Sequence, residues 1–139
     1  MIVLLDLNYT LAENSPERGT SPPPMTKRLE EETYRLWLVR LLRPHHVILV
    51  TARPERWREP TLERIRALTG WSPQEAFFND RNLGPPAFKE HVLRAHLLPR
   101  FEAEEMCAIE SNPRTRAMYE RYGVPAMPVG ERPWRRLPA

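Results

Sequence analysis

The chain has 139 residues, of which 28% are charged, and its formal net charge is +3. A chain of this length can bury most of the apolar surface of its unfolded form, so it needs no disulfide to fold, and we expect one domain over residues 1–139. The small positive charge, with basic and acidic residues mixed along the chain, allows nucleic-acid binding but does not indicate it.

Cysteine usage and hydropathy indicate an intracellular protein. Cys107 has no CxxC neighbour and lies in an apolar run, which is typical of a buried structural thiol. The N-terminal apolar run 2–5 is too short for a secretion signal, and no later stretch approaches the roughly 20 residues of a membrane span. We therefore expect a soluble, cytoplasmic protein without a membrane partner.

Short apolar runs alternate with longer segments of helical spacing. In chain order, we predict a strand at 2–5, a flexible proline-rich loop at 12–25, a helix at 27–42, a strand at 47–50, a helix at 55–68, a strand at 76–78, a helix at 87–98, a strand at 106–109, a helix at 114–122 and a strand at 124–127. Strands that alternate with helices predict an α/β fold with three layers. This is a Rossmann-like, five-stranded parallel sheet with helices on both faces.

Local signals predict several helix boundaries. Thr26 is a candidate cap for the first helix, and Pro54 is expected near the start of the second, which Gly70 would end. Asn112 precedes a proline and should open the last helix, which Gly123 should close.

Four polar residues follow or face the predicted strand ends, where an open parallel sheet binds its ligands. Asp6 suits a nucleophile or metal ligand, and Glu110 a second ligand for a hard cation such as Mg²⁺. Thr51 suits a phosphate oxygen, and Lys89 suits a phosphate or a crowded carboxylate. Each also has an ordinary structural interpretation: a turn former for Asp6, an ST-turn or cap for Thr51, a solvated helix residue for Lys89, and a capping turn with an arginine partner for Glu110.

Taken together, these residues resemble the four-part signature of the haloacid dehalogenase superfamily. The matching strings are DLNYTLA at 6–12, VTARP at 50–54, FKE at 88–90 and IESNPR at 109–114. The resemblance extends over about residues 1–128. Within the superfamily it is greatest to the phosphatase domains of polynucleotide kinase 3′-phosphatases, and the magnesium-dependent phosphatases with a tyrosine at the position of Tyr9 are a second candidate. It implies a HAD-like fold without a large cap domain and a magnesium-dependent phosphatase or phosphotransferase.

The resemblance also implies roles for individual residues. Asp6 would form an aspartyl-phosphate, and Mg²⁺ would be held by Asp6, the backbone carbonyl of Asn8 and Glu110. Thr51 and Lys89 would hold the phosphate oxygens. The residues expected to contact substrate are Thr10, Thr51, Ala52, Arg53 and Lys89.

Asn8 departs from the superfamily pattern, in which phosphatases resemble one another in having a second aspartate at this position. An amide cannot donate or accept the proton of the leaving group, and a missing acid or base costs on the order of 100- to 10,000-fold in rate. Three interpretations stay open: a substrate whose leaving group needs no acid, a binding module without turnover, or a deliberate replacement that traps a complex. Ser111 is a milder departure, because many relatives have an acid there.

The absence of a large insertion predicts an open cleft that admits a bulky substrate or is covered by a protein partner. Arginines expected near its rim favour a nucleotide or nucleic-acid end, although a solvated, ion-paired helix face explains them equally well: Arg53, Arg56, Arg58 and Arg81. The C-terminal tail, 129–139, contains a basic segment that could contact phosphates or a partner, or be an ordinary surface terminus.

Overall fold

The centre of the structure is a parallel sheet with β1 in its middle. The computed structural model describes residues 1–130. Five strands pair in the order β3-β2-β1-β4-β5, all parallel. Their bounds are Ile2–Leu5 for β1, His46–Pro54 for β2, Glu75–Asn79 for β3, Met106–Ile109 for β4 and Ala126–Met127 for β5. The strand order reverses between β1 and β4, so the crevice expected of such a sheet lies at the carboxyl ends of these two strands.

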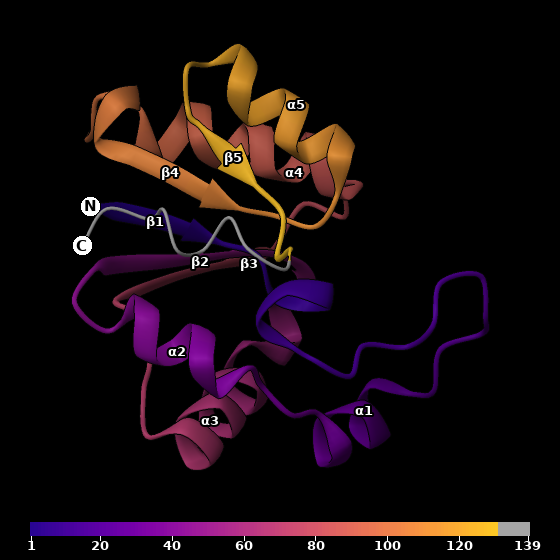
Figure 1. Cartoon of the computed structure of the whole chain (residues 1–139). Coiled ribbons are helices and arrows are strands. Elements are labelled where there is room, and N and C mark those ends of the chain that lie inside the picture. Colours follow the sequence, from indigo (N-terminus) through magenta and orange to yellow (C-terminus); the bar gives the residue numbers. More distant parts are fainter. Residues whose placement is uncertain (131–139) are drawn as a thin grey trace.

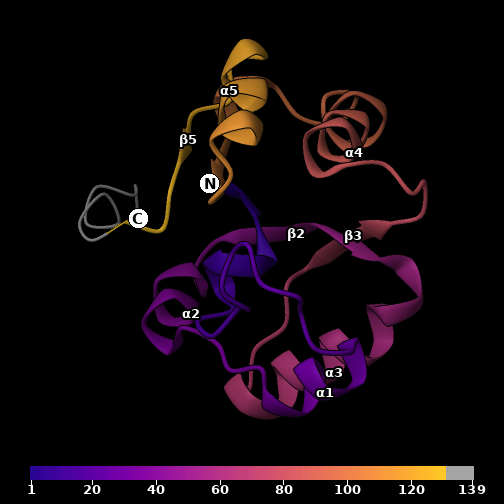
Figure 2. The same cartoon turned by 90° about the vertical axis from the view of Figure 1, so that its right-hand side faces the viewer.

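Helices cover both faces of this sheet, as Figures 1 and 2 show. One face carries α1 (Met25–Glu31), α2 (Leu36–Leu42) and α3 (Arg58–Thr69), and the other carries α4 (Pro85–Val92) and α5 (Pro113–Arg121). Short helical turns connect them: η1 Leu7–Leu11, η2 Glu55–Trp57, η3 Leu93–Leu97 and η4 Ala103–Glu105. The predicted three-layer α/β fold is confirmed, and no cap domain interrupts the described residues.

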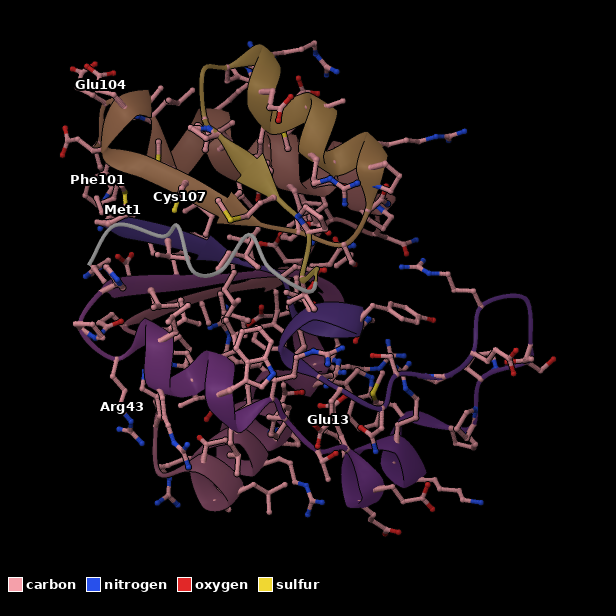
Figure 3. All side chains as sticks on the ribbon, viewed as in Figure 1. Met1, Glu13, Arg43, Phe101, Glu104 and Cys107 are labelled. Carbon is pink, nitrogen blue, oxygen red and sulfur yellow. The ribbon has the colours of Figure 1, made fainter. Side chains whose placement is uncertain are left out.

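The alternation of side chains along the strands divides the core into two clusters. Val3 and Leu5 of β1 belong to the cluster beneath α2 and α3, whereas Leu4 belongs to the cluster beneath α4 and α5. Successive residues of a strand point to opposite faces, so a fully apolar strand can fill both layers. Cys107 of β4 is 4% exposed and lies in the interior beside β1 (Figure 3), where burial raises the pKa of its thiol to about 11.

The predicted helix 27–42 is wrong, because the chain forms two helices separated by an extended segment. Glu32 is only 5% exposed and pairs with Arg53, while Tyr34 forms an antiparallel bridge with Ala12. These tertiary contacts hold residues 32–35 out of the helix. Thr26 is not the cap either: α1 begins at Met25, and no side chain caps its first turn.

Other boundaries are confirmed or shifted. Gly70 ends α3 with φ of 68°, which favours glycine, and Asn112 caps α5 by accepting the Arg114 N–H at 2.9 Å. Gly123 follows the end of α5 with φ of 81°. Pro54, expected to open a helix, instead ends β2, because that strand pairs with β3 up to Asn79.

Residues 13–24 form no helix or strand, in agreement with the predicted irregular segment, although Ala12 forms a bridge and Met25 already opens α1. In Figure 1 this loop extends outward on the side to which the strands point. The Glu13 N–H, at the start of this loop, donates to Thr33 O at 3.0 Å, so the loop and α1 together form a segment that is closed by a backbone hydrogen bond.

Most of the predicted tail lies outside the described residues, since 131–139 are not part of them. Val129 packs against the cluster beneath α2 and α3. None of the described helices is long and apolar enough to cross a membrane.

Candidate active site

A small pocket opens at the carboxyl ends of β1, β2 and β4. Its volume is about 110 Å³, and it is lined by Asp6, Asn8, Tyr9, Arg18, Thr51, Ala52, Pro85, Lys89, Glu110, Ser111 and Asn112. Most of the residues predicted for the site are therefore brought together here. Two of them, Thr10 and Arg53, do not line it.

Asp6 is fixed by contacts to both of its carboxylate oxygens. Its backbone N–H donates to Ile109 O at 2.9 Å, which extends the β1–β4 pairing one residue beyond the strands. Oδ1 accepts from Lys89 Nζ at 2.8 Å, and Oδ2 accepts from Thr10 Oγ1 at 2.8 Å and Ser111 Oγ at 3.0 Å. Thr10 is fully buried and supports Asp6, so its side chain does not face the pocket as a substrate ligand.

Lys89 joins the carboxylates that follow the two neighbouring strands. It extends from α4, is 2% exposed, and donates to Asp6 Oδ1 at 2.8 Å and to Glu110 Oε1 at 2.5 Å. The alternative of a solvated helix residue is therefore wrong for Lys89. The capping turn suggested for Glu110 is present as well, since its Oε2 accepts the Asn112 N–H at 3.0 Å, but its charged partner is Lys89.

The charges of these three groups depend on one another. Burial alone would raise the pKa of Asp6, but the Lys89 ammonium and hydrogen bonds from Glu110, Lys89 and Thr10 hold it below its ordinary value. Burial and the charge of Asp6 raise the pKa of Glu110 to about 7, although Lys89 opposes the shift. Burial would lower the pKa of Lys89, but the two carboxylates raise it. Asp6 therefore remains ionised at neutral pH beside a charged Lys89.

Oxygen atoms suited to a hard cation converge beside Asp6. Ser111 Oγ lies 3.0 Å from Asp6 Oδ2 and 3.3 Å from the Asn8 carbonyl oxygen, so both predicted ligand atoms are within hydrogen-bond distance of the same hydroxyl. Mg²⁺ prefers oxygen ligands and usually keeps several waters beside one or two carboxylates. Residues 1–130 contain no cluster of three His, Cys, Asp or Glu side chains arranged for a metal, so a cage made only of such side chains is absent there. The donor set fits a partly hydrated magnesium ion.

Thr51 and Ala52 form the β2 side of the pocket. Thr51 is 1% exposed, and its hydroxyl accepts the Arg53 N–H at 3.1 Å, so the ST-turn interpretation is confirmed. A hydroxyl that accepts this bond still has its own hydrogen to donate, which leaves it able to bind a phosphate oxygen.

Arg53 does not lie at the rim, contrary to the expectation from sequence. It is 2% exposed, and its guanidinium donates to Glu32 at 3.1 and 2.6 Å and to Thr61 Oγ1 at 3.0 Å. An arginine held by a buried carboxylate in this way cannot bind substrate with the same nitrogens. The other arginines predicted near the rim, Arg56, Arg58 and Arg81, do not line the pocket either.

Asn8 is oriented by two guanidinium groups. Its Oδ1 accepts from Arg53 Nη2 at 3.0 Å and from Arg28 Nη2 at 3.5 Å. Guanidinium groups only donate, so the amide oxygen must face them and the NH₂ group must face the other way. Within the described part of the chain, this NH₂ group has no hydrogen-bond partner, and Asn8 lines the pocket. The residue therefore offers a donor where an aspartate would offer an acid or base.

Some pocket residues were not among the predicted site residues: Tyr9, Arg18, Pro85, Ser111 and Asn112. Ser111 and Asn112 directly follow Glu110, so their position after a strand was a usable signal. Arg18 had none, because it lies in a loop without periodicity and reaches the pocket only through the path of that loop.

Comparison with known proteins shows the fold but not the family. No family model and no curated protein matches the chain. A chain in the solved structure of the Pnkp1/Rnl/Hen1 RNA repair complex matches with a TM-score of 0.73 and 20% identity, over 91% of this chain and 41% of that one. A second structure of this complex matches with a TM-score of 0.68 and 18% identity, over 91% and 45%. A hypothetical protein from Xanthomonas campestris matches with a TM-score of 0.52 and 15% identity, over 97% and 67%. The chain thus spans less than half the length of the first two.

Proposed function

We propose that this chain is a magnesium-dependent phosphatase or phosphotransferase of the haloacid dehalogenase type, acting on a phosphate monoester of a nucleotide or polynucleotide. The observation that carries the proposal is the buried contact of Lys89 with Asp6 and Glu110, at the point where the strand order reverses. An ionised carboxylate beside a fixed ammonium, in a pocket lined by further phosphate donors, suits transfer of a phosphoryl group.

In this mechanism Asp6 attacks phosphorus with a carboxylate oxygen. The new bond joins Asp6 to phosphorus, the bond from phosphorus to the leaving oxygen breaks, and an aspartyl-phosphate remains for water or another acceptor to resolve. Lys89 and the Thr51 hydroxyl face the equatorial oxygens, where charge must be stabilised. Because Lys89 is held by two carboxylates, its position does not depend on the substrate.

Magnesium would be held by the Asp6 carboxylate, the Asn8 carbonyl oxygen and Glu110. When bound, the ion would neutralise charge on the phosphoryl oxygens. Glu110 supplies the second carboxylate, and its charge near neutral pH is balanced by Lys89. Ser111 stands between the other two ligand atoms, and its hydroxyl is a further oxygen for the ion or its waters.

Asn8 restricts the substrates of this reaction. Without an acid at this position, the leaving oxygen must depart as an anion or take its proton from water. Aryl or acyl phosphates should react faster than alkyl phosphates, which lose the roughly 100- to 10,000-fold contribution of a general acid.

The choice of a nucleotide or polynucleotide is supported by two observations. The described residues contain no cap domain over the pocket, so a long substrate can approach it. The fold resembles a chain of an RNA repair complex. We extend the proposal to a protein partner over the open side of the pocket and, from the single buried cysteine, to a cytoplasmic location.

The orientation of Asn8 favours a second candidate, a phosphate-binding domain with little or no turnover. Asn8 lines the pocket, and its NH₂ group points away from the two arginines; such a group can hold a phosphate oxygen but cannot transfer a proton. Such a domain would keep the functions of Lys89 and Thr51 without hydrolysis.

The test is a magnesium-dependent phosphatase assay on the chain and on Asn8→Asp, with aryl phosphate, nucleotide, and DNA and RNA 3′-phosphate substrates. Asn8→Asp should raise turnover of the alkyl phosphates by at least about 100-fold. Asn82→Asp, an exposed change of the same kind outside the pocket, is the matched control. If Asn8→Asp turns over no substrate while phosphate and Mg²⁺ still bind, the binding domain is the correct function. Activity that survives Asp6→Asn would eliminate Asp6 as the nucleophile.

A further inference from the structure

The irregular loop after β1 is attached to the pocket through one residue, Tyr9. The Tyr9 N–H donates to Ser15 Oγ at 2.8 Å, and its hydroxyl donates to Pro16 O at 2.6 Å. The Arg18 guanidinium lies over the Tyr9 ring, 3.9 Å from its centroid. Three separate parts of Tyr9 thus hold residues 15–18 in place.

Tyr9 has an unusual backbone conformation for a residue with a side chain. Its φ of 61° lies in the left-handed region, which non-glycine residues seldom adopt. It lies three residues after Asp6 and lines the same pocket. The bonds from Tyr9 to the loop and the ring contact with Arg18 compensate for this conformation.

Arg18 differs from the other pocket cation in its charge balance. Lys89 is neutralised by Asp6 and Glu110, whereas Arg18 is exposed and forms no ion pair with any residue in 1–130. A guanidinium group presents paired donors that match phosphate oxygens and can do so while it stacks on an aromatic ring. Arg18 is therefore available for an anion at the edge of the pocket.

The pocket is too small for a whole nucleotide. Its volume of about 110 Å³ is below the roughly 300 Å³ at which ordinary small-molecule sites begin. It can take the reacting phosphoryl group, and the rest of the substrate must extend outside. Arg18 lines the pocket, so it is placed to contact the part of the substrate that follows the reacting phosphate.

We propose that Arg18 binds the neighbouring backbone phosphate of a polynucleotide, so that the substrate is a phosphorylated strand end and not a mononucleotide. Arg18 is then a specificity residue, and Tyr9 is the positioning residue that holds it. This inference rests on the proposed function, since it assumes that the reacting phosphate occupies the pocket beside Asp6.

The test compares the affinities of two ligands in the presence of Mg²⁺: a nucleoside 3′-monophosphate and a single-stranded tetranucleotide with a 3′-phosphate. The full chain should bind the tetranucleotide about tenfold more tightly, as expected for one added charge-assisted contact. In Arg18→Ala the ratio of the two affinities should fall to about one. Removal of one phosphate contact should also reduce the slope of log K against log salt by about 0.7 for a single strand.

Arg40→Ala is the matched control, since it removes an exposed arginine from α2 outside the pocket and should keep the tenfold ratio. Tyr9→Phe loses the hydrogen bond to Pro16 and should lower the ratio of the two affinities two- to threefold. The double variant, Tyr9→Phe with Arg18→Ala, should have the same ratio as Arg18→Ala alone. Additive losses in that pair would show that Tyr9 does not act through Arg18.

The outcomes separate this inference from the proposed function. Suppose that the monophosphate binds but the tetranucleotide binds no more tightly, or that the tetranucleotide still binds more tightly in Arg18→Ala. The proposed role of Arg18 is then wrong, although the pocket does bind phosphate. If neither ligand binds and no substrate is turned over, the proposed function fails together with the inference.

Discussion

Lys89 and Asp6 are 83 positions apart in the chain, yet the Lys89 ammonium lies 2.8 Å from Asp6 Oδ1 in a region from which solvent is almost excluded. Charges in such a place are costly unless each has a partner. Glu110 is the second partner, so two carboxyl groups contact the Lys89 ammonium. The buried site therefore needs a cation at this position to balance their charge.

Lys89→Met should lower the free energy of unfolding by about 3–5 kcal/mol at pH 8, because it leaves two buried carboxylates without a cation. Urea unfolding measures this, and the loss should be smaller at pH 5, where one carboxyl can take up a proton. Lys27→Met is the control: Lys27 is exposed on α1, and its replacement should change stability by less than about 0.5 kcal/mol. An equal effect of the two changes would mean that the Lys89 contacts contribute nothing to stability.

Arg53→Met should cost about 3–5 kcal/mol, because Glu32 is left buried without its partner. The combined change Arg53→Met and Glu32→Met should recover part of this, since it leaves no buried charge without a partner. The recovery should be incomplete, because the buried Thr61 and Tyr34 hydroxyls each lose a hydrogen-bond partner. Arg66→Met tests an exposed pair, Arg66 with Glu63, which should contribute at most about 1 kcal/mol. Thermal or urea unfolding of the four proteins measures these differences. If the double variant is no more stable than Arg53→Met, the loss arises from packing.

The pH dependence of stability should include a contribution from Glu75. Hydrogen bonds from Arg100, at 2.6 and 2.8 Å, and from His46 lower the pKa of Glu75 to about 2, from an ordinary value of 4.5. A lowered pKa means that the contribution is complete above about pH 4.5 and is lost as the pH falls towards 2. Glu75→Gln should therefore be less stable than the parent at pH 7 and equal to it near pH 2, with a small difference because the site is partly exposed to solvent.

Glu104→Gln is the control for this pH dependence. Glu104 lies at the end of the molecule away from the loop (Figure 3), is exposed, and forms no ion pair with the described residues. Its replacement should leave the pH profile of the unfolding midpoint unchanged. A Glu75→Gln profile parallel to that of the parent protein at every pH would contradict the assigned pKa.

Much of the fold and the centre of the site could be predicted from local pattern. The apolar runs before Asp6 and Glu110 predicted two buried strands, and the end of a buried strand is where a polar side chain meets the crevice of a parallel sheet. Lys89 could be predicted from its place near the start of a helix after the third strand. In each case the signal lies within a few residues of the group itself.

The errors have a different physical origin, since they depend on contacts between distant parts of the chain. The break in the helix at Glu32 depends on Arg53, which is 21 residues away, and it overrides a good helical period. The burial of Arg53 follows from the same contact. Arg18 reaches the pocket because Tyr9 holds its loop, and no short-range pattern encodes that contact.

The contacts that close the segment containing the loop also make the loop a place where the protein can gain sequence without losing its fold. Ala12 pairs with Tyr34, and the Asn14 side chain bonds to Glu31 O and to the Thr33 N–H, so the segment made of the loop and α1 is closed by contacts outside residues 15–24. Doubling the length of such a closed loop costs only about 0.6 kcal/mol in chain entropy. An insertion after Gly19 would directly follow Arg18, which lines the pocket, so this is where a covering segment could be grafted to narrow the range of substrates.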